Sequence, residues 1–249
     1  MKKKILFLIA ISICLTSKSQ KTDLLLPSAM DREQVIHHKS FSLSYNSSYV
    51  MPSWVTYKVI KTQVNKLEKV KEKYMPDPDV ISRSATKKDY KDGGYIMAQL
   101  YNYLDVAQDG GAKDETFYMS NIVPMKLAFY NYIWLKSEDL IRLWNANSDG
   151  LYVACGPILT DIPFVTIGED KVTVPKRFYK AVYDPKRQKA IGFIFVNGNA
   201  SGTLKGYAVS IDAIEKETGI DLFQSLEDSV ELKIESDFNV NDWNFDVLK

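Results

Sequence analysis

Residues 114–144 read DETFYMSNIVPMKLAFYNYIWLKSEDLIRLW, and this stretch decides how the rest of the chain is interpreted. An apolar run, Phe117 to Met119, is typical of a strand. It leads through Ser120-Asn121 and Pro124 into a predicted helix of about five turns, because apolar residues then recur at helical spacing and no further proline interrupts them. The stretch therefore predicts a strand, a turn and a long helix in succession.

Two charged residues on this helix are candidates for a functional site. Glu138 and Arg142 are four positions apart, so they share a face of the helix and can pair. Trp134 lies one turn before Glu138 on the same side. A carboxylate and a guanidinium held on a rigid helix suit phosphate or metal chemistry. The alternative is an ordinary surface ion pair, which contributes little to stability.

The first nineteen residues have the pattern of a secretory signal peptide. Three lysines precede the apolar run Ile5 to Leu15, and Ser17-Lys18-Ser19 is a small-x-small cleavage site. We therefore expect cleavage after Ser19, a secreted or periplasmic protein and no membrane span. Cleavage removes four lysines, leaving 28 basic against 31 acidic side chains, a net charge of −3. A nucleic-acid-binding protein usually carries a basic surplus, so nucleic-acid binding is expected to be weak or confined to a local lysine-rich surface.

The remaining chain divides into a polar lead-in, residues 20–34, one domain, residues 35–235, and an acidic and aromatic tail, residues 236–249, which is either docked or flexible. Cys155 is the one cysteine left after cleavage, so no internal disulfide is expected. A lysine-rich segment, Lys61 to Lys73, has a short helical period and is either a solvated face or a backbone-contacting patch. Predicted strands cover Val35–Tyr45, Trp54–Ile60 after a turn at Pro52, Leu151–Cys155, Lys171–Val174, Arg177–Tyr183, Ala190–Val196 and Tyr207–Ser210. A helix is predicted from the N-cap Ser210 to Thr218, ending at Gly219. Strands and helices without regular alternation predict an α+β fold.

Several of these segments, in this order, resemble one family. The chain resembles the DNA/RNA non-specific endonucleases, the ββα-metal (His-Me finger) nucleases that include the Serratia-type and endonuclease G enzymes. The resemblance implies a mixed or antiparallel central sheet with flanking helices. The matching segments are FSLSYN with PSWVTYKV (Phe41–Val59), DYKDGGY (Asp89–Tyr95), ETFYMSNIVP (Glu115–Pro124), Trp134-x3-Glu138-x3-Arg142, YVACGPIL (Tyr152–Leu159), VPKRFYKAVYD (Val174–Asp184), AIGFIFVN (Ala190–Asn197) and TGIDLF (Thr218–Phe223).

The family's catalytic motif is replaced in this chain. The resemblance implies a DRGH motif whose histidine is the general base, and this motif falls on Ile96-Met97-Ala98-Gln99, with Gln99 at the histidine position. It also implies an asparagine ligand to Mg²⁺ on the central helix, and that position holds Tyr130, next to Asn131. A glutamine amide does not take a proton near neutral pH. Losing a general base costs about 10²–10⁴-fold in rate, and losing the metal costs several kcal/mol more.

The resemblance also assigns supporting roles that this chain keeps. Asn121, Glu138 and Arg142 match residues that position the metal-bound water and the substrate phosphate, so Glu138 and Asn121 are metal candidates and Arg142 and Asn121 nucleic-acid candidates. The same residues are equally compatible with a structural role, in which Glu138 simply neutralises Arg142.

Our interpretation is an endonuclease-like protein that has lost phosphodiester hydrolysis and binds nucleic acid, or a protein or glycan partner, without a tightly held metal. One alternative is an active Mg²⁺-dependent endonuclease with a rearranged site, in which Asn131 or Glu138 holds the metal and His37 or His38 is the base. Another is a non-enzymatic, partner-binding protein. In that case the tyrosines near the cleft, at 101, 103, 118, 130 and 132, are stacking platforms, interface anchors or core. The sequence does not indicate an oligomeric state.

Overall fold

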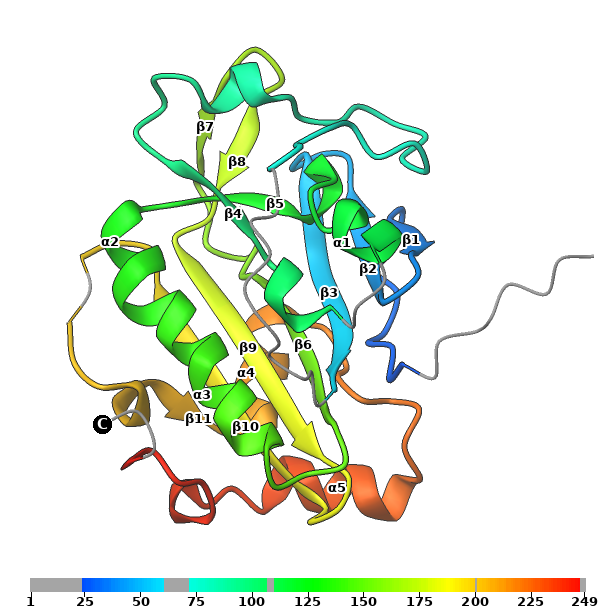
Figure 1. Ribbon diagram of the computed structural model, residues 1–249, viewed down its shortest axis with the longest axis vertical. Coiled ribbons are helices and arrows are strands. Elements are labelled where there is room, and N and C mark those ends of the chain that lie inside the picture. The colour runs from blue at the N-terminus through cyan, green and yellow to red at the C-terminus, as the bar shows by residue number, and fades with distance from the viewer. Residues whose placement is uncertain (1–23, 61–71, 107–109, 200, 247–249) are drawn as a thin grey trace, which may run out of the picture.

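A seven-stranded antiparallel sheet is the centre of the fold (Figure 1). The computed structural model describes residues 24–60, 72–106, 110–199 and 201–246. The strand order is β1-β2-β3-β6-β9-β10-β11. The strands are β1 (Gln34–His37), β2 (Phe41–Asn46), β3 (Met51–Val59), β6 (Leu151–Pro157), β9 (Arg177–Asp184), β10 (Lys189–Val196) and β11 (Ala208–Val209).

A ββα unit next to this sheet positions the candidate site. Strands β4 (Ile96–Gln99) and β5 (Ile122–Met125) pair antiparallel, with Gln99 opposite Ile122. After Lys126 the chain enters the central helix, which consists of α2 (Leu127–Phe129), a π-helical turn (Tyr130–Trp134) and α3 (Leu135–Asn145). A second hairpin is formed by β7 (Val165–Ile167) and β8 (Val172–Val174).

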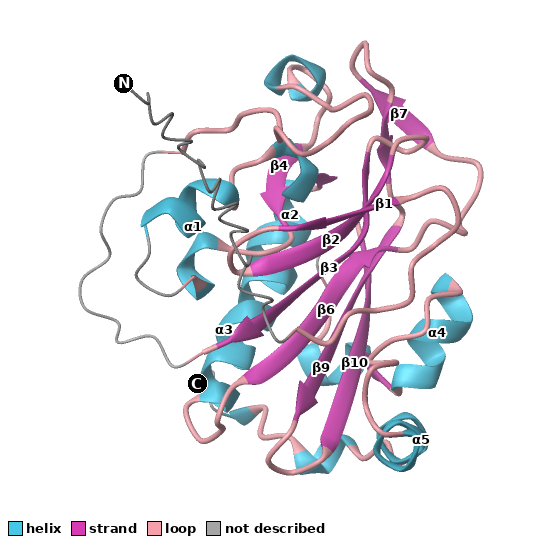
Figure 2. Ribbon diagram, turned by 90° about the vertical axis from the view of Figure 1, so that its right-hand side faces the viewer, coloured by secondary structure: helices cyan, strands magenta, loops and turns pink. Residues whose placement is uncertain are grey.

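Helices cover both faces of the large sheet (Figure 2). The central helix and α1 (Gly110–Glu115) lie on one side, and α4 (Ile211–Thr218) and α5 (Asp228–Ser236) on the other. Short 3₁₀ helices complete the described elements, at Lys87–Tyr90, Tyr103–Asp105, Met119–Asn121, Leu204–Tyr207 and Val240–Asp242. The predicted α+β class is confirmed, and the central sheet is antiparallel throughout.

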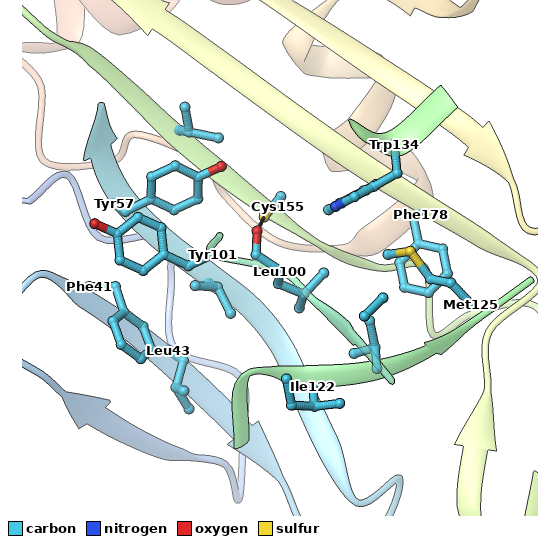
Figure 3. Close-up of a cluster of buried hydrophobic side chains, with 14 of the residues drawn as sticks. Phe41, Leu43, Tyr57, Leu100, Tyr101, Ile122, Met125, Trp134, Cys155 and Phe178 are labelled. Carbon is cyan, nitrogen blue, oxygen red and sulfur yellow. Dashed lines mark hydrogen bonds between the residues drawn. The ribbon is translucent and has the colours of Figure 1, made fainter. Parts of the chain in front are cut away.

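Alternation along the strands divides the core into two clusters. In β9, Phe178 and Val182 face the central helix, whereas Tyr179 and Ala181 face α4 and α5. Figure 3 shows the cluster beneath the central helix, where Trp134 packs on Phe178. Cys155 is fully buried there, and its Sγ lies 3.5 Å from the Leu100 carbonyl.

Three local predictions were wrong. The segment predicted as one strand, Val35–Tyr45, is a hairpin that turns at residues 38–40, where the His38 N–H donates to the Phe41 carbonyl. Pro52 is inside β3 rather than at a turn, because a register shift between Ser44 and Tyr45 lets the pairing with β2 continue past a residue that has no N–H. Phe117–Met119 is a loop running into a 3₁₀ helix, not a strand.

The other predicted strands from Leu151 to Ser210 are present within one to three residues at each end. Helix α4 begins after Ser210, whose hydroxyl accepts from the Ala213 N–H, and ends at Gly219 in the left-handed conformation, as predicted. Residues 1–19, predicted to be a signal peptide, and most of Lys61–Lys73 lie outside the described residues.

The described part of the tail is docked onto the domain. The Trp243 ring is 3% exposed and its centroid lies 4.6 Å from that of Trp144. The Trp144 Nε1 donates to the Asn244 carbonyl at 2.7 Å. Among the described residues, none of the helices has the length and apolar character needed to cross a bilayer.

Candidate nucleic-acid site

Gln99 is at the end of β4 and its amide is fixed by hydrogen bonds. The side chain is 5% exposed, and Nε2 donates to the Thr116 carbonyl at 3.0 Å and to Thr116 Oγ1 at 2.9 Å. Both amide hydrogens therefore have an acceptor on one residue. The position that the resemblance assigns to a general base holds a buried neutral amide that serves to join β4 to the loop before β5.

Tyr130 begins the π-helical turn and faces a pocket beside β4. The Leu135 N–H donates to the Tyr130 carbonyl, five residues back, so the turn contains one extra residue. Such π-turns often mark functional positions. The extra residue does not bring Asn131 into the pocket. Asn131 is exposed, whereas Tyr130 and Met97 both line the cavity.

Asn121 is fully buried, and its side chain links two loops by hydrogen bonds to their backbone. Its Oδ1 accepts from the Tyr101 N–H at 2.9 Å, and its Nδ2 donates to the carbonyls of Tyr101 at 2.9 Å and Thr116 at 2.8 Å. All of its amide hydrogens and its oxygen are therefore engaged within the protein. The structure places this predicted metal and nucleic-acid residue in a structural role.

Glu138 is buried in a charged cluster under the central helix. Glu138 is 2% exposed, and its Oε2 accepts a hydrogen bond from Asn102 Nδ2 at 2.8 Å. Lys180 Nζ lies 3.7 Å from Oε1 and Arg142 Nη2 lies 3.5 Å from Oε2. Burial raises the pKa of the Glu138 carboxyl, and the two cations oppose that shift. Glu138 and Arg142 do form the predicted ion pair, but Lys180 is an equally close partner.

Arg142 is held mainly by a residue that the sequence did not single out. Its Nε and Nη2 bind the two carboxylate oxygens of Asp105 at 2.6 and 3.1 Å, which is the bidentate geometry that guanidinium favours. Its Nη1 binds Asp139 at 2.8 Å. The guanidinium that was predicted to bind phosphate is therefore paired with three carboxylates, those of Asp105, Asp139 and Glu138.

The two histidines lie apart from this pocket. His37 is exposed and its Nδ1 lies 2.9 Å from Ser42 Oγ. His38 is buried, and its Nε2 lies 3.0 Å from Asp77 Oδ2, an oxygen that also accepts from the Ser120 hydroxyl. Neither histidine lines the pocket formed by Met97 and Tyr130.

The tyrosines predicted near the cleft have different surroundings. Tyr101 is in the core, and its ring centroid lies 4.4 Å from that of Tyr57, with the two rings tilted by 35°. Tyr132 is 60% exposed on the outer side of the helix. Of the five tyrosines, Tyr130 is the one that lines the cavity of about 550 Å³ beside β4. The cavity is also lined by three tyrosines that were not among the five predicted near the cleft, at 74, 90 and 95.

This ββα unit, with a carboxylate and an arginine on its helix, matches a known family. The family model for DNA/RNA non-specific endonucleases covers residues 27–229. The chain belongs to this family. Mouse mitochondrial nuclease EXOG is 26% identical over 215 residues, which are 79% of this chain and 58% of that protein. Nuclease C1 of Cunninghamella echinulata var. echinulata is 26% identical over 211 residues, 77% of this chain and 83% of that protein.

The fold is also that of a solved family structure. An endonuclease G chain from the crystal structure of the EndoG/EndoGI complex aligns with a TM-score of 0.69 and 23% identity, over 78% of this chain and 86% of that one. The chain spans about three fifths of the length of the vertebrate EXOG relatives that it matches. The predicted family and ββα-metal fold are thus confirmed.

The side chains at the family's metal position do not fit Mg²⁺. Magnesium requires oxygen ligands in octahedral geometry, mainly carboxylates and waters. The ligand position holds the Tyr130 phenol, whose pKa is raised by burial and by nearby Glu138. Asn121 and Glu138 are buried and already bonded within the protein. The ligand position therefore holds a phenol in place of the amide oxygen that the resemblance implies, and the nearby Asn121 amide is engaged within the protein.

Three residues of the charged cluster were missed from the sequence, namely Asn102, Asp105 and Lys180. A signal for Lys180 existed, since the strand RFYKAVYD alternates and puts residue 180 on the same face as Phe178 and Val182. A lysine in that register predicts a buried cation that needs a carboxylate partner. No comparable pattern marks the other two, which follow β4 in a loop and a 3₁₀ helix.

Proposed function

We propose that this chain is a nucleic-acid-binding member of the non-specific endonuclease family that does not hydrolyse phosphodiester bonds. The observation that carries the proposal is Gln99, a buried amide bonded to Thr116, at the general-base position. A neutral amide cannot remove a proton from water near neutral pH. Tyr130 at the metal position supports the same conclusion.

A cleavage and binding experiment on the intact mature protein tests the proposal. Supercoiled plasmid, single-stranded DNA and RNA are incubated with Mg²⁺ or Mn²⁺, with and without EDTA, beside a family nuclease that has an intact motif. We expect no EDTA-sensitive cleavage, but salt-sensitive binding of labelled single-stranded DNA. Metal-dependent cleavage at a rate near that of the control enzyme refutes the loss of hydrolysis, and absence of any binding refutes the nucleic-acid role.

The second candidate is an active metal-dependent endonuclease with a rearranged site. Its relatives are named nucleases, and His38, Asp77 and Asp79 offer one nitrogen and two carboxylate oxygens within 4.8 Å of one another. Under this alternative His38→Ala abolishes EDTA-sensitive cleavage while the protein stays folded. Under our proposal there is no such cleavage to abolish, so the same assay separates the two.

We also propose that the mature protein is secreted or periplasmic and begins at Gln20. The support is the charged, apolar and small-residue pattern of residues 1–19. Mass spectrometry of protein recovered from the native host should give an N-terminal peptide that starts at Gln20. Recovery of an intact N-terminus from the cytoplasmic fraction contradicts this.

A further inference from the structure

The cavity beside β4 combines aromatic rings with cationic side chains. It has a volume of about 550 Å³, within the range of small-ligand pockets. It lies where β4 passes the start of the central helix, and Met97 and Tyr130 belong to its wall. Those are the positions at which the family resemblance implies an arginine and a metal-binding asparagine. The two substitutions have replaced a charge and a polar ligand by a thioether and a ring.

Three tyrosines present ring surface to this cavity. Tyr74, Tyr95 and Tyr130 are each partly buried, so each ring has one part packed on the protein and another part open. They come from three separate segments. A fourth ring, Tyr90, is buried behind them and donates its hydroxyl to the Ile122 carbonyl at 3.3 Å, which fixes the floor. Open tyrosine rings are the groups on which nucleobases stack irrespective of sequence.

The cationic side chains are held next to the rings. Lys87 and Lys91 line the cavity, and Lys87 Nζ lies 5.5 Å from the centre of the Tyr74 ring. Lys126 Nζ lies 4.0 Å above the Tyr95 ring and donates to the Gly94 carbonyl. Glu72 is the one acidic residue among the described residues of the wall. The local charge is therefore positive although the mature chain is slightly acidic, as phosphate binding requires.

We propose that this cavity binds one nucleotide of a single strand, with its base stacked on the tyrosines and its phosphate on Lys87 and Lys91. This inference rests on the proposed nucleic-acid-binding function and names its ligand. A base that is paired in a duplex is not accessible to such a cavity unless it leaves the stack. The site therefore selects single strands over duplexes and does not depend on a metal ion.

The experiment measures binding of a fluorescein-labelled oligothymidylate and of a duplex of equal length by anisotropy, in EDTA. Tyr130→Ala should weaken single-strand binding about tenfold, because a stacking contact of about 1.4 kcal/mol corresponds to a factor of ten. Tyr130→Phe keeps the ring and should bind within twofold of the unchanged protein. Tyr132→Ala is the matched control, since Tyr132 is two residues along the same helix, 60% exposed and outside this cavity.

The possible results separate the two proposals. Full single-strand affinity in Tyr130→Ala, or equal loss in Tyr132→Ala, overturns the cavity while leaving nucleic-acid binding intact. Duplex binding as tight as single-strand binding also overturns it. No binding by the unchanged protein overturns both proposals. Thymidine monophosphate should compete with the oligonucleotide, and circular dichroism of each variant shows whether it is folded.

Discussion

Neutralising Glu138 should destabilise the protein strongly, because the residue is the counter-ion of a fully buried lysine. Lys180 is 0% exposed and its Nζ lies 3.7 Å from Glu138 Oε1. At an effective dielectric constant of about 20 this separation corresponds to an attraction of about 4 kcal/mol. Neither Nζ nor Oε1 has a hydrogen-bond partner among the described residues. The ion pair with Glu138 and the Trp134 ring, whose centroid lies 3.8 Å from Nζ, therefore offset the charge of the buried ammonium.

Removing one partner of a buried pair costs about 3–5 kcal/mol, since it leaves an uncompensated charge. Glu138→Gln should therefore lower the free energy of unfolding by about 3 kcal/mol in urea titrations, measured at neutral pH by circular dichroism. Adding Lys180→Met should recover most of that loss, because both charges are then gone and the methionine fills similar space.

Asp139→Ala is the matched control for this experiment. Asp139 is adjacent in sequence and also pairs with Arg142, but its side chain is 59% exposed. Its removal should cost less than about 1 kcal/mol. If Glu138→Gln costs no more than Asp139→Ala, the carboxylate does not stabilise the buried lysine and the structural role assigned to Glu138 is wrong.

Four further outcomes are expected. Burial raises the pKa of the Cys155 thiol to about 12, so Cys155 should not react with a thiol reagent at pH 8 until urea unfolds the chain. Because that folded-state pKa exceeds the unfolded value, Cys155 should lower stability only above about pH 9, which a Cys155→Ala comparison across pH measures. Trp243→Ala should destabilise by about 3 kcal/mol in thermal unfolding, because its buried ring packs on Trp144; a change below 1 kcal/mol contradicts tail docking. Changing Lys87 and Lys91 together to glutamine should reduce the slope of log affinity against log salt by about 1.4 for single-stranded DNA, and an unchanged slope shows that they do not contact phosphate.

The sequence predicted most of the large sheet and the central helix. Strands such as β9 and β10 alternate clearly and are bounded by turn residues, so the side-chain period identifies them. Helix α4 carries its own start and stop signals in Ser210 and Gly219. The hairpin β1–β2 was missed because its turn, at residues 38–40, contains no glycine, proline, asparagine or aspartate, and Ser40 alone is a weak turn signal.

The candidate site was predicted less completely, because its contacts join segments far apart in sequence. The positions of Gln99 and Tyr130 in the candidate site were predicted by counting residues from short motifs. In the structure Gln99 is the last residue of β4, and Tyr130 lines the cavity beside β4. The helical spacing predicted that Glu138 pairs with Arg142. It could not predict the second partner, Lys180, which is on a strand 42 positions later. Nor does local sequence indicate that Tyr74 and Tyr95 share a cavity with Tyr130. Those contacts depend on tertiary packing alone.

The direct test of the central claim is the rate at which the unchanged mature protein nicks supercoiled plasmid in Mg²⁺, relative to the same reaction in EDTA. With a neutral amide at Gln99 and a phenol at Tyr130, loss of the base alone removes about 10²–10⁴-fold and loss of the metal several kcal/mol more. We expect equal background rates with and without EDTA. An EDTA-sensitive rate within about tenfold of an intact family nuclease would contradict it.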